Sequence, residues 1–64
     1  MCLASVYVET PKSKRLAMEK VSLLEVNDGI IVCRDFLGRS VQIEAQLQRI
    51  DLENNIILCK KEND

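Results

Sequence analysis

The spacing of turn signals constrains this chain more than any other feature, because it leaves room only for short segments between the turns. Turns are predicted at residues 10–15, 27–29, 35–39 and 53–55. The Asn-Asp-Gly turn at 27–29 is the strongest hairpin signal, since its residues tolerate positive φ. Turns that recur roughly every 8–12 residues are typical of a small antiparallel barrel or sandwich.

The segments between the turns carry the alternating pattern of strands. In residues 3–9, Ala4, Val6 and Val8 fall on one face and polar side chains on the other, which predicts a half-buried strand. Four further strands are predicted at residues 30–33, 40–44, 50–52 and 56–60. The pattern therefore predicts an all-β fold of about five to six short strands.

Two segments are less regular. Residues 16–26 fit a helix by spacing, but the hairpin turn that follows needs a strand before it. We therefore expect at least residues 23–26 to be extended, with a bend near 20–22. Residues 45–48 are expected to form a single helical turn.

Residues 1–60 are expected to form one β-barrel domain, followed by a polar tail at 61–64. The predicted core takes the inward-facing apolar residue of each strand. Its members are Val6, Val8, Leu24, Ile30, Val32, Val41, Ile43, Ile50, Leu52, Ile56 and Leu58.

A chain of 64 residues has a marginal core, because it buries only roughly 60% of its unfolded surface on folding. Small scaffolds therefore rely on disulfides, a metal or a partner subunit. Three cysteines and no secretory signal favour reduced thiols and a cytoplasmic location. Oligomerisation, with or without a metal, is the remaining source of stability.

Composition disfavours several classes of function. The net charge of −1, with both signs mixed, lacks the basic footprint of a nucleic-acid-binding domain. No apolar run approaches the ~20 residues of a membrane span. The chain has no histidine, which removes the commonest general base and the commonest metal ligand. We therefore expect no enzymatic activity.

Cys2 is the candidate metal ligand. Removal of Met1 would leave an α-amine and a thiol on one residue. Together they form a five-membered N,S chelate that suits Ni(II), Cu(II) or Zn(II). The competing interpretation is a cysteine that merely starts a strand.

The other cysteines and the basic cluster favour structural roles. Cys33 lies in an apolar strand segment, where a free cysteine packs as a small hydrophobe. Cys59 is also expected to be structural, although its exposure depends on strand register. Lys12, Lys14 and Arg15 form a basic cluster typical of a solvated loop. RNA binding is disfavoured because Tyr7 and Phe36 are the only aromatic residues available for base stacking.

Three stretches together resemble a known family. They are the opening Met1-Cys2-Leu3-Ala4 before a valine-rich strand, the segment at 23–29 with its Asp-Gly turn, and residues 48–58, where an Arg-Ile-Asp-Leu turn precedes an aliphatic strand. In this order, and over nearly the whole chain, they resemble the CooT family. These small nickel-binding proteins are linked to maturation of nickel-containing carbon monoxide dehydrogenase.

The resemblance implies a small SH3-like β-barrel that forms a homodimer. It implies that Cys2 of each subunit binds one Ni(II) between them, and that the protein is a non-enzymatic nickel metallochaperone with the dehydrogenase as client. Relatives have also been labelled RNA-binding on fold analogy alone. Two alternatives stay open: an RNA- or protein-binding barrel in which Cys2 is incidental, and a redox-sensing protein that uses Cys2.

Overall fold

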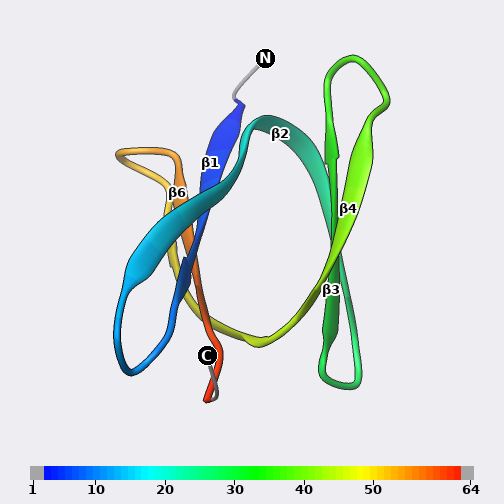
Figure 1. The fold of residues 1–64 in the computed structure, drawn as a ribbon. Coiled ribbons are helices and arrows are strands. Elements are labelled where there is room, and N and C mark those ends of the chain that lie inside the picture. Colours follow the sequence, from blue (N-terminus) through cyan, green and yellow to red (C-terminus); the bar gives the residue numbers. More distant parts are fainter. Residues whose placement is uncertain (1–2, 63–64) are drawn as a thin grey trace.

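A computed structural model describes residues 3–62, which form one curled six-stranded sheet (Figure 1). No helix occurs in these residues, so the all-β prediction is confirmed. The strands are β1 (Ala4–Glu9), β2 (Lys14–Asn27), β3 (Ile30–Asp35), β4 (Ser40–Glu44), β5 (Gln46–Asp51) and β6 (Ile56–Lys60). Without a helix, this part of the chain also has none that could cross a membrane.

The sheet has the order β4-β3-β2-β1-β6-β5 and does not close into a barrel, since β4 and β5 are its two edges. All neighbouring strands are antiparallel except β1 and β6, which run parallel. Ala45 connects the two edges, and its N–H donates to the carbonyl of Gly29 over 3.1 Å. The sheet therefore curls far enough for the chain to cross directly from one edge to the other.

β2 produces the curl, because its 14 residues serve both halves of the sheet. Its first part pairs with β1 and its second part with β3. Lys20 lies between the two parts with a φ of 57°, and a register shift follows between Val21 and Leu23. The predicted bend near residues 20–22 is therefore confirmed, and the whole of 16–26 is extended rather than helical.

The helical turn predicted at residues 45–48 is wrong, because β5 begins at Gln46. A register shift between Leu47 and Arg49 marks a bulge in this strand. Leu47 pairs with Cys59, and Ile50 pairs with Ile57 two residues earlier in β6. Leu47 and Ile50 therefore lie on the same face of the sheet although they are three positions apart in sequence. For this reason β5 lacks strict alternation.

The predicted core is correct in β1 and partly wrong elsewhere. The buried hydrophobic residues are Val6, Val8, Val21, Ile31, Cys33, Ile43, Ala45, Leu58 and Cys59. Leu24, Val32, Val41 and Ile56 are half-buried. Ile30, Ile50 and Leu52, however, are exposed.

The core errors have structural causes. In β3 the buried set is Ile31, Cys33 and Asp35, so the inward face is one residue out of phase with the prediction. The run is apolar on both faces, and alternation therefore cannot fix its phase. Leu52 lies beyond the end of β5, in a turn.

Candidate functional site

Cys2, the predicted metal ligand, lies just outside the residues that the structure describes. The strands around it are defined. Ala4 pairs with Val21 of β2, and Ser5 pairs with Ile56 of β6. The N-terminal end of β1 is therefore held between these two strands. Cys2 precedes Ala4 by two positions in the sequence.

Two turns lie at this same end of the molecule (Figure 1). The β3–β4 turn (residues 36–39) follows Asp35, which pairs with Val21, the partner of Ala4. The β5–β6 turn (residues 52–55) is joined to β1 directly, because the Ser5 N–H donates to the Asn55 carbonyl over 2.9 Å. The start of β1 thus lies between the two turns.

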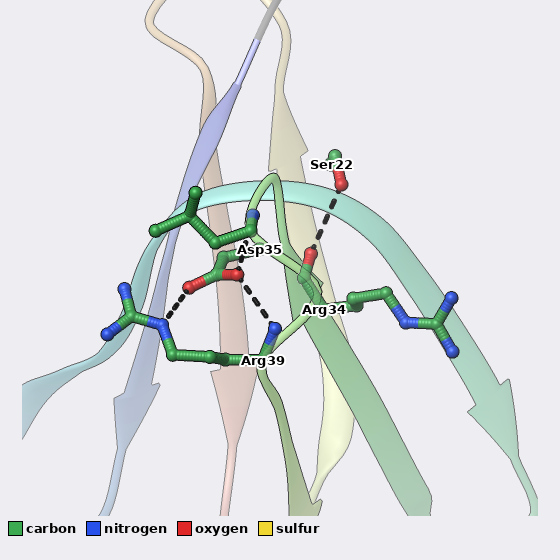
Figure 2. Close-up of polar contacts among 5 residues, drawn as sticks. Ser22, Arg34, Asp35 and Arg39 are labelled. Atoms are coloured by element: carbon green, nitrogen blue, oxygen red, sulfur yellow. Dashed lines mark hydrogen bonds and ion pairs between the residues drawn. The ribbon is translucent and has the colours of Figure 1, made fainter.

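Asp35 organises the β3–β4 turn from a buried position. Its side chain is 2% exposed, and Oδ1 accepts hydrogen bonds from the N–H groups of Leu37 at 2.9 Å and Arg39 at 3.0 Å. Oδ2 accepts from Nε of Arg39 at 2.8 Å, as Figure 2 shows. Burial acts to raise the pKa of Asp35, but the hydrogen bonds and the guanidinium charge outweigh it and lower the pKa below its ordinary value.

Asp51 organises the β5–β6 turn in a similar way. Oδ1 accepts from the N–H groups of Glu53 and Asn54, each at 3.1 Å, and Oδ2 accepts from Nδ2 of Asn54 at 3.0 Å. The Asn54 side-chain hydrogen bond is the largest cause of a lowered pKa for Asp51. Both turns are therefore fixed by an aspartate at the end of the preceding strand, as Asx turns are.

Lys20 ties the bend of β2 to the β3–β4 turn. Its carbonyl accepts the Phe36 N–H at 3.1 Å, and its Nζ lies 5.9 Å from the centroid of the Phe36 ring. The left-handed backbone of this lysine is thus supported by contacts with the neighbouring turn.

Cys33 and Cys59 are fully buried in the core, which confirms the burial expected for Cys33 and settles the register of Cys59. Burial, with a smaller effect from Cys59, raises the pKa of the Cys33 thiol to about 11. Burial likewise raises the pKa of Cys59. Metals bind the thiolate form, and burial disfavours that form at both cysteines.

The predicted basic cluster lies at the other end of β1 from Cys2. Lys14 pairs with Glu9 and Arg15 with Val8, and Lys12 lies in the adjoining turn. Nζ of Lys14 is 5.6 Å from the centroid of the Tyr7 ring. The basic cluster therefore lies at the C-terminal end of β1, away from the end of the strand that Cys2 precedes.

Residues 3–62 contain no group of three or more Cys, Asp or Glu side chains arranged to hold a metal ion. No pocket occurs in this part of the chain either. The organising role of Asp35 and Asp51 was missed from the sequence. An aspartate at the start of a predicted turn was the available signal.

Comparison with known proteins identifies the family. The family model described as "CO dehydrogenase accessory protein CooT" matches residues 1–60. The chain belongs to the CooT family. The resemblance stated from the sequence motifs is thereby confirmed, and the matched range includes Cys2.

The fold also matches a solved CooT structure. A crystal structure described as a "putative CooT from Carboxydothermus hydrogenoformans" superposes with a TM-score of 0.84 at 24% sequence identity. The match covers 97% of this chain and 100% of that one. No curated protein matches the sequence. At this identity the structural likeness establishes the shared fold.

Proposed function

We propose that this CooT protein is a cytoplasmic, non-enzymatic accessory protein that binds Ni(II) for carbon monoxide dehydrogenase. The observation that carries the proposal is the family match over residues 1–60, because the family is described as an accessory protein of that nickel enzyme. The proposed ligand is Cys2, and the proposed assembly is a homodimer with one Ni(II) between its subunits.

The donor set explains why two subunits are needed. One Cys2 supplies a thiolate and a nearby backbone nitrogen, either the free α-amine or a deprotonated amide. That is half of a four-coordinate set. A two-fold axis brings the same residue of both chains together and completes four donors of mixed N and S type, which suit square-planar Ni(II).

The buried cysteines support the choice of Cys2. Cys33 and Cys59 are inaccessible, and burial raises the pKa of each thiol. Cys2 is the remaining cysteine among the three of the chain. Two subunits are also the expected source of stability for so small a core.

A nickel titration of untagged protein tests the proposal. Thiolate-to-metal charge-transfer absorption is expected to saturate at about half an equivalent of Ni(II) per chain, as one metal per dimer requires. Cys2→Ser should abolish this absorption. Cys33→Ser and Cys59→Ser are the matched controls and should keep the stoichiometry. Nickel binding by Cys2→Ser with the wild-type stoichiometry would overturn the assignment.

The pH dependence and the chain terminus sharpen the same experiment. Nickel affinity should fall at acid pH, because the ligands must lose protons to bind. An uncleaved N-terminal tag removes the free amine but keeps the thiol. Weaker binding by the tagged protein would assign the nitrogen donor to the amine, and unchanged binding would assign it to an amide.

A further inference from the structure

Positive charge gathers at one end of the sheet, although the chain as a whole has a net charge of −1. This basic end is formed by the β1–β2 turn (residues 10–13), the start of β2 and the end of β6. Figure 1 shows the turn and the end of β6 at the opposite end of the molecule from the start of β1. The cations of the basic end are Lys12, Lys14, Arg15, Lys60 and Lys61. Residues far apart in the sequence are thus brought together by strand pairing.

Strand register places two of these lysines in one row across the sheet. Glu9 of β1 pairs with Lys14 of β2 on one side and with Lys60 of β6 on the other. Residues paired in register lie on the same face of a sheet. Lys14 and Lys60 are therefore two strand spacings apart, which is about 10 Å. An extended chain covers about the same distance in three residues, so a short segment can reach both lysines.

The backbone that carries these lysines is fixed by hydrogen bonds. In the β1–β2 turn, Oγ1 of Thr10 accepts from the Ser13 N–H at 3.0 Å, and the Thr10 N–H donates to the Ser13 carbonyl at 2.7 Å. After β6, the Lys61 N–H donates to the Glu9 carbonyl at 2.8 Å. The two sides of the basic end are thus joined through β1 before any partner binds, which lowers the entropy lost on binding.

The carboxylates nearby do not neutralise this row. Among residues 3–62, Glu9 forms no ion pair with Lys14 or Lys60, and the ion pair that does form joins Arg39 to Asp35 elsewhere. Nζ of Lys14 lies instead 5.6 Å from the centroid of the Tyr7 ring. Glu62, beside Lys61, is exposed to solvent. Both lysines of the row therefore remain available to carboxylates of another molecule.

We propose that the basic end binds a short acidic segment of another protein, with carboxylates of that segment paired to Lys14 and Lys60. An acidic segment fits better than nucleic acid for two reasons. The Tyr7 ring already contacts Lys14, so it is a poor platform for base stacking. The charge is also local, and the acidic remainder of the chain repels a long polyanion.

This surface is distinct from the proposed nickel site. Ala4 and Glu9 mark the two ends of β1, and a strand of this length spans about 17 Å. That distance exceeds the screening length of about 8 Å at physiological ionic strength. A protein partner at the basic end therefore leaves the N-terminal end of β1 free.

The first test is the affinity for a fluorescent polyglutamate peptide of about twelve residues, measured by anisotropy at low salt. Lys14→Glu/Lys60→Glu is expected to weaken binding at least about tenfold, because it reverses both charges of the row. The matched control is Lys20→Glu/Arg34→Glu, which makes the same change in net charge at exposed positions outside the basic end. Its affinity should stay within about twofold of wild type. Circular dichroism checks that both variants remain folded.

The second test uses a variant that should bind more tightly. Glu9→Gln removes the carboxylate between the two lysines, so the affinity for polyglutamate should rise at least about twofold. Glu25→Gln is the matched control, because Glu25 is an exposed carboxylate of β2 that pairs with Val32, away from the row. Its affinity should equal that of wild type. An unchanged affinity for Glu9→Gln would show that the peptide does not bind at this row.

The remaining outcomes separate this inference from its competitors. Failure of wild type to bind the peptide, or equal losses in the two charge-reversal variants, would overturn the basic end as a docking surface. Tighter binding of a poly(U) RNA of equal length would overturn the assignment to an acidic protein. Cys2→Ser should bind polyglutamate as wild type does, with or without Ni(II), so a failed nickel titration leaves this result intact. Loss of peptide binding in Cys2→Ser would overturn the independence of the two ends.

Discussion

The β3–β4 and β5–β6 turns use the same device in two different environments. In each, an aspartate at the strand end accepts two backbone N–H groups through Oδ1 and one side-chain N–H through Oδ2. Asp35 is buried and bonds to a charged guanidinium, whereas Asp51 is half-buried and bonds to the neutral amide of Asn54. Two turns with similar hydrogen bonds can therefore contribute differently to the stability of the fold.

The difference lies in what each aspartate supports. Asp35 lies on the inward face of β3 with Ile31 and Cys33, so its carboxylate has lost most of its water. Its hydrogen bonds must replace that hydration. Asp51 keeps contact with solvent, and water can replace a lost partner. The β3–β4 turn is thus coupled to the core, and the β5–β6 turn is largely local.

The largest expected effect is that of Asp35→Asn. The new amide can still accept from the two backbone N–H groups, but its Nδ2 would face Nε of Arg39, and two donors cannot pair. The melting temperature should fall by roughly 10 °C, because a buried charge-assisted contact is lost from a small domain. Thermal unfolding followed by circular dichroism measures this. A change below about 2 °C would show that Asp35 is not coupled to the core.

Gly38→Ala should have the next largest effect. Gly38 has a φ of 90°, and a Cβ at this position would meet no atom within 4 Å. The cost is therefore backbone strain alone, about 1–2 kcal/mol in the free energy of unfolding. Asn55→Gly is the matched change in the other turn. Asn55 already tolerates its φ of 56°, so this variant should be nearly neutral in chemical denaturation. Equal losses of stability for Gly38→Ala and Asn55→Gly would contradict the expected difference between the two turns.

Asp51→Asn should have a smaller effect than Asp35→Asn. Its Oδ1 can keep both backbone hydrogen bonds, and the Asn54 side chain can rotate to present its oxygen to the new amide. We expect a fall in melting temperature of about 3 °C or less. Asn54→Ala should act similarly, since it removes the same side-chain contact. A larger loss for Asp51→Asn than for Asp35→Asn would reverse the ranking of the two turns.

The fold was predictable where local signals were unambiguous. Strict alternation identified β1, and the requirement for a hairpin strand located the bend that Lys20 makes in β2. The phase of β3 was not predictable, because Ile30, Ile31 and Val32 are all apolar and only the paired neighbours decide which side faces inward. In β5 the cause is different: the bulge between Leu47 and Arg49 interrupts the period-2 pattern, so alternation could not predict this strand.

The site was predictable to a different degree. The three family motifs identified the CooT family, while the burial of Asp35 depends on the curl of the sheet and leaves no trace in the sequence. Leu52 was assigned to the core because it is apolar. Hydrophobicity alone cannot distinguish a side chain buried by its own chain from one available to a partner.

The smallest expected effect is the loss, in acid, of the stability that the two aspartate carboxylates contribute to their turns. Both aspartates have a folded-state pKa below the ordinary value of 3.8. Their contributions are therefore present above about pH 3.8 and are lost as the pH falls through the folded pKa values. The stability difference between wild type and Asp51→Asn should be constant from pH 7 to about 5 and shrink below 3.8. The contribution of the Asp35 carboxylate should likewise be lost as the pH falls through the lowered pKa of Asp35. Denaturant midpoints measured between pH 2 and 7 test this, and a difference that grew on acidification would show that neither carboxylate stabilises its turn in the ionised form.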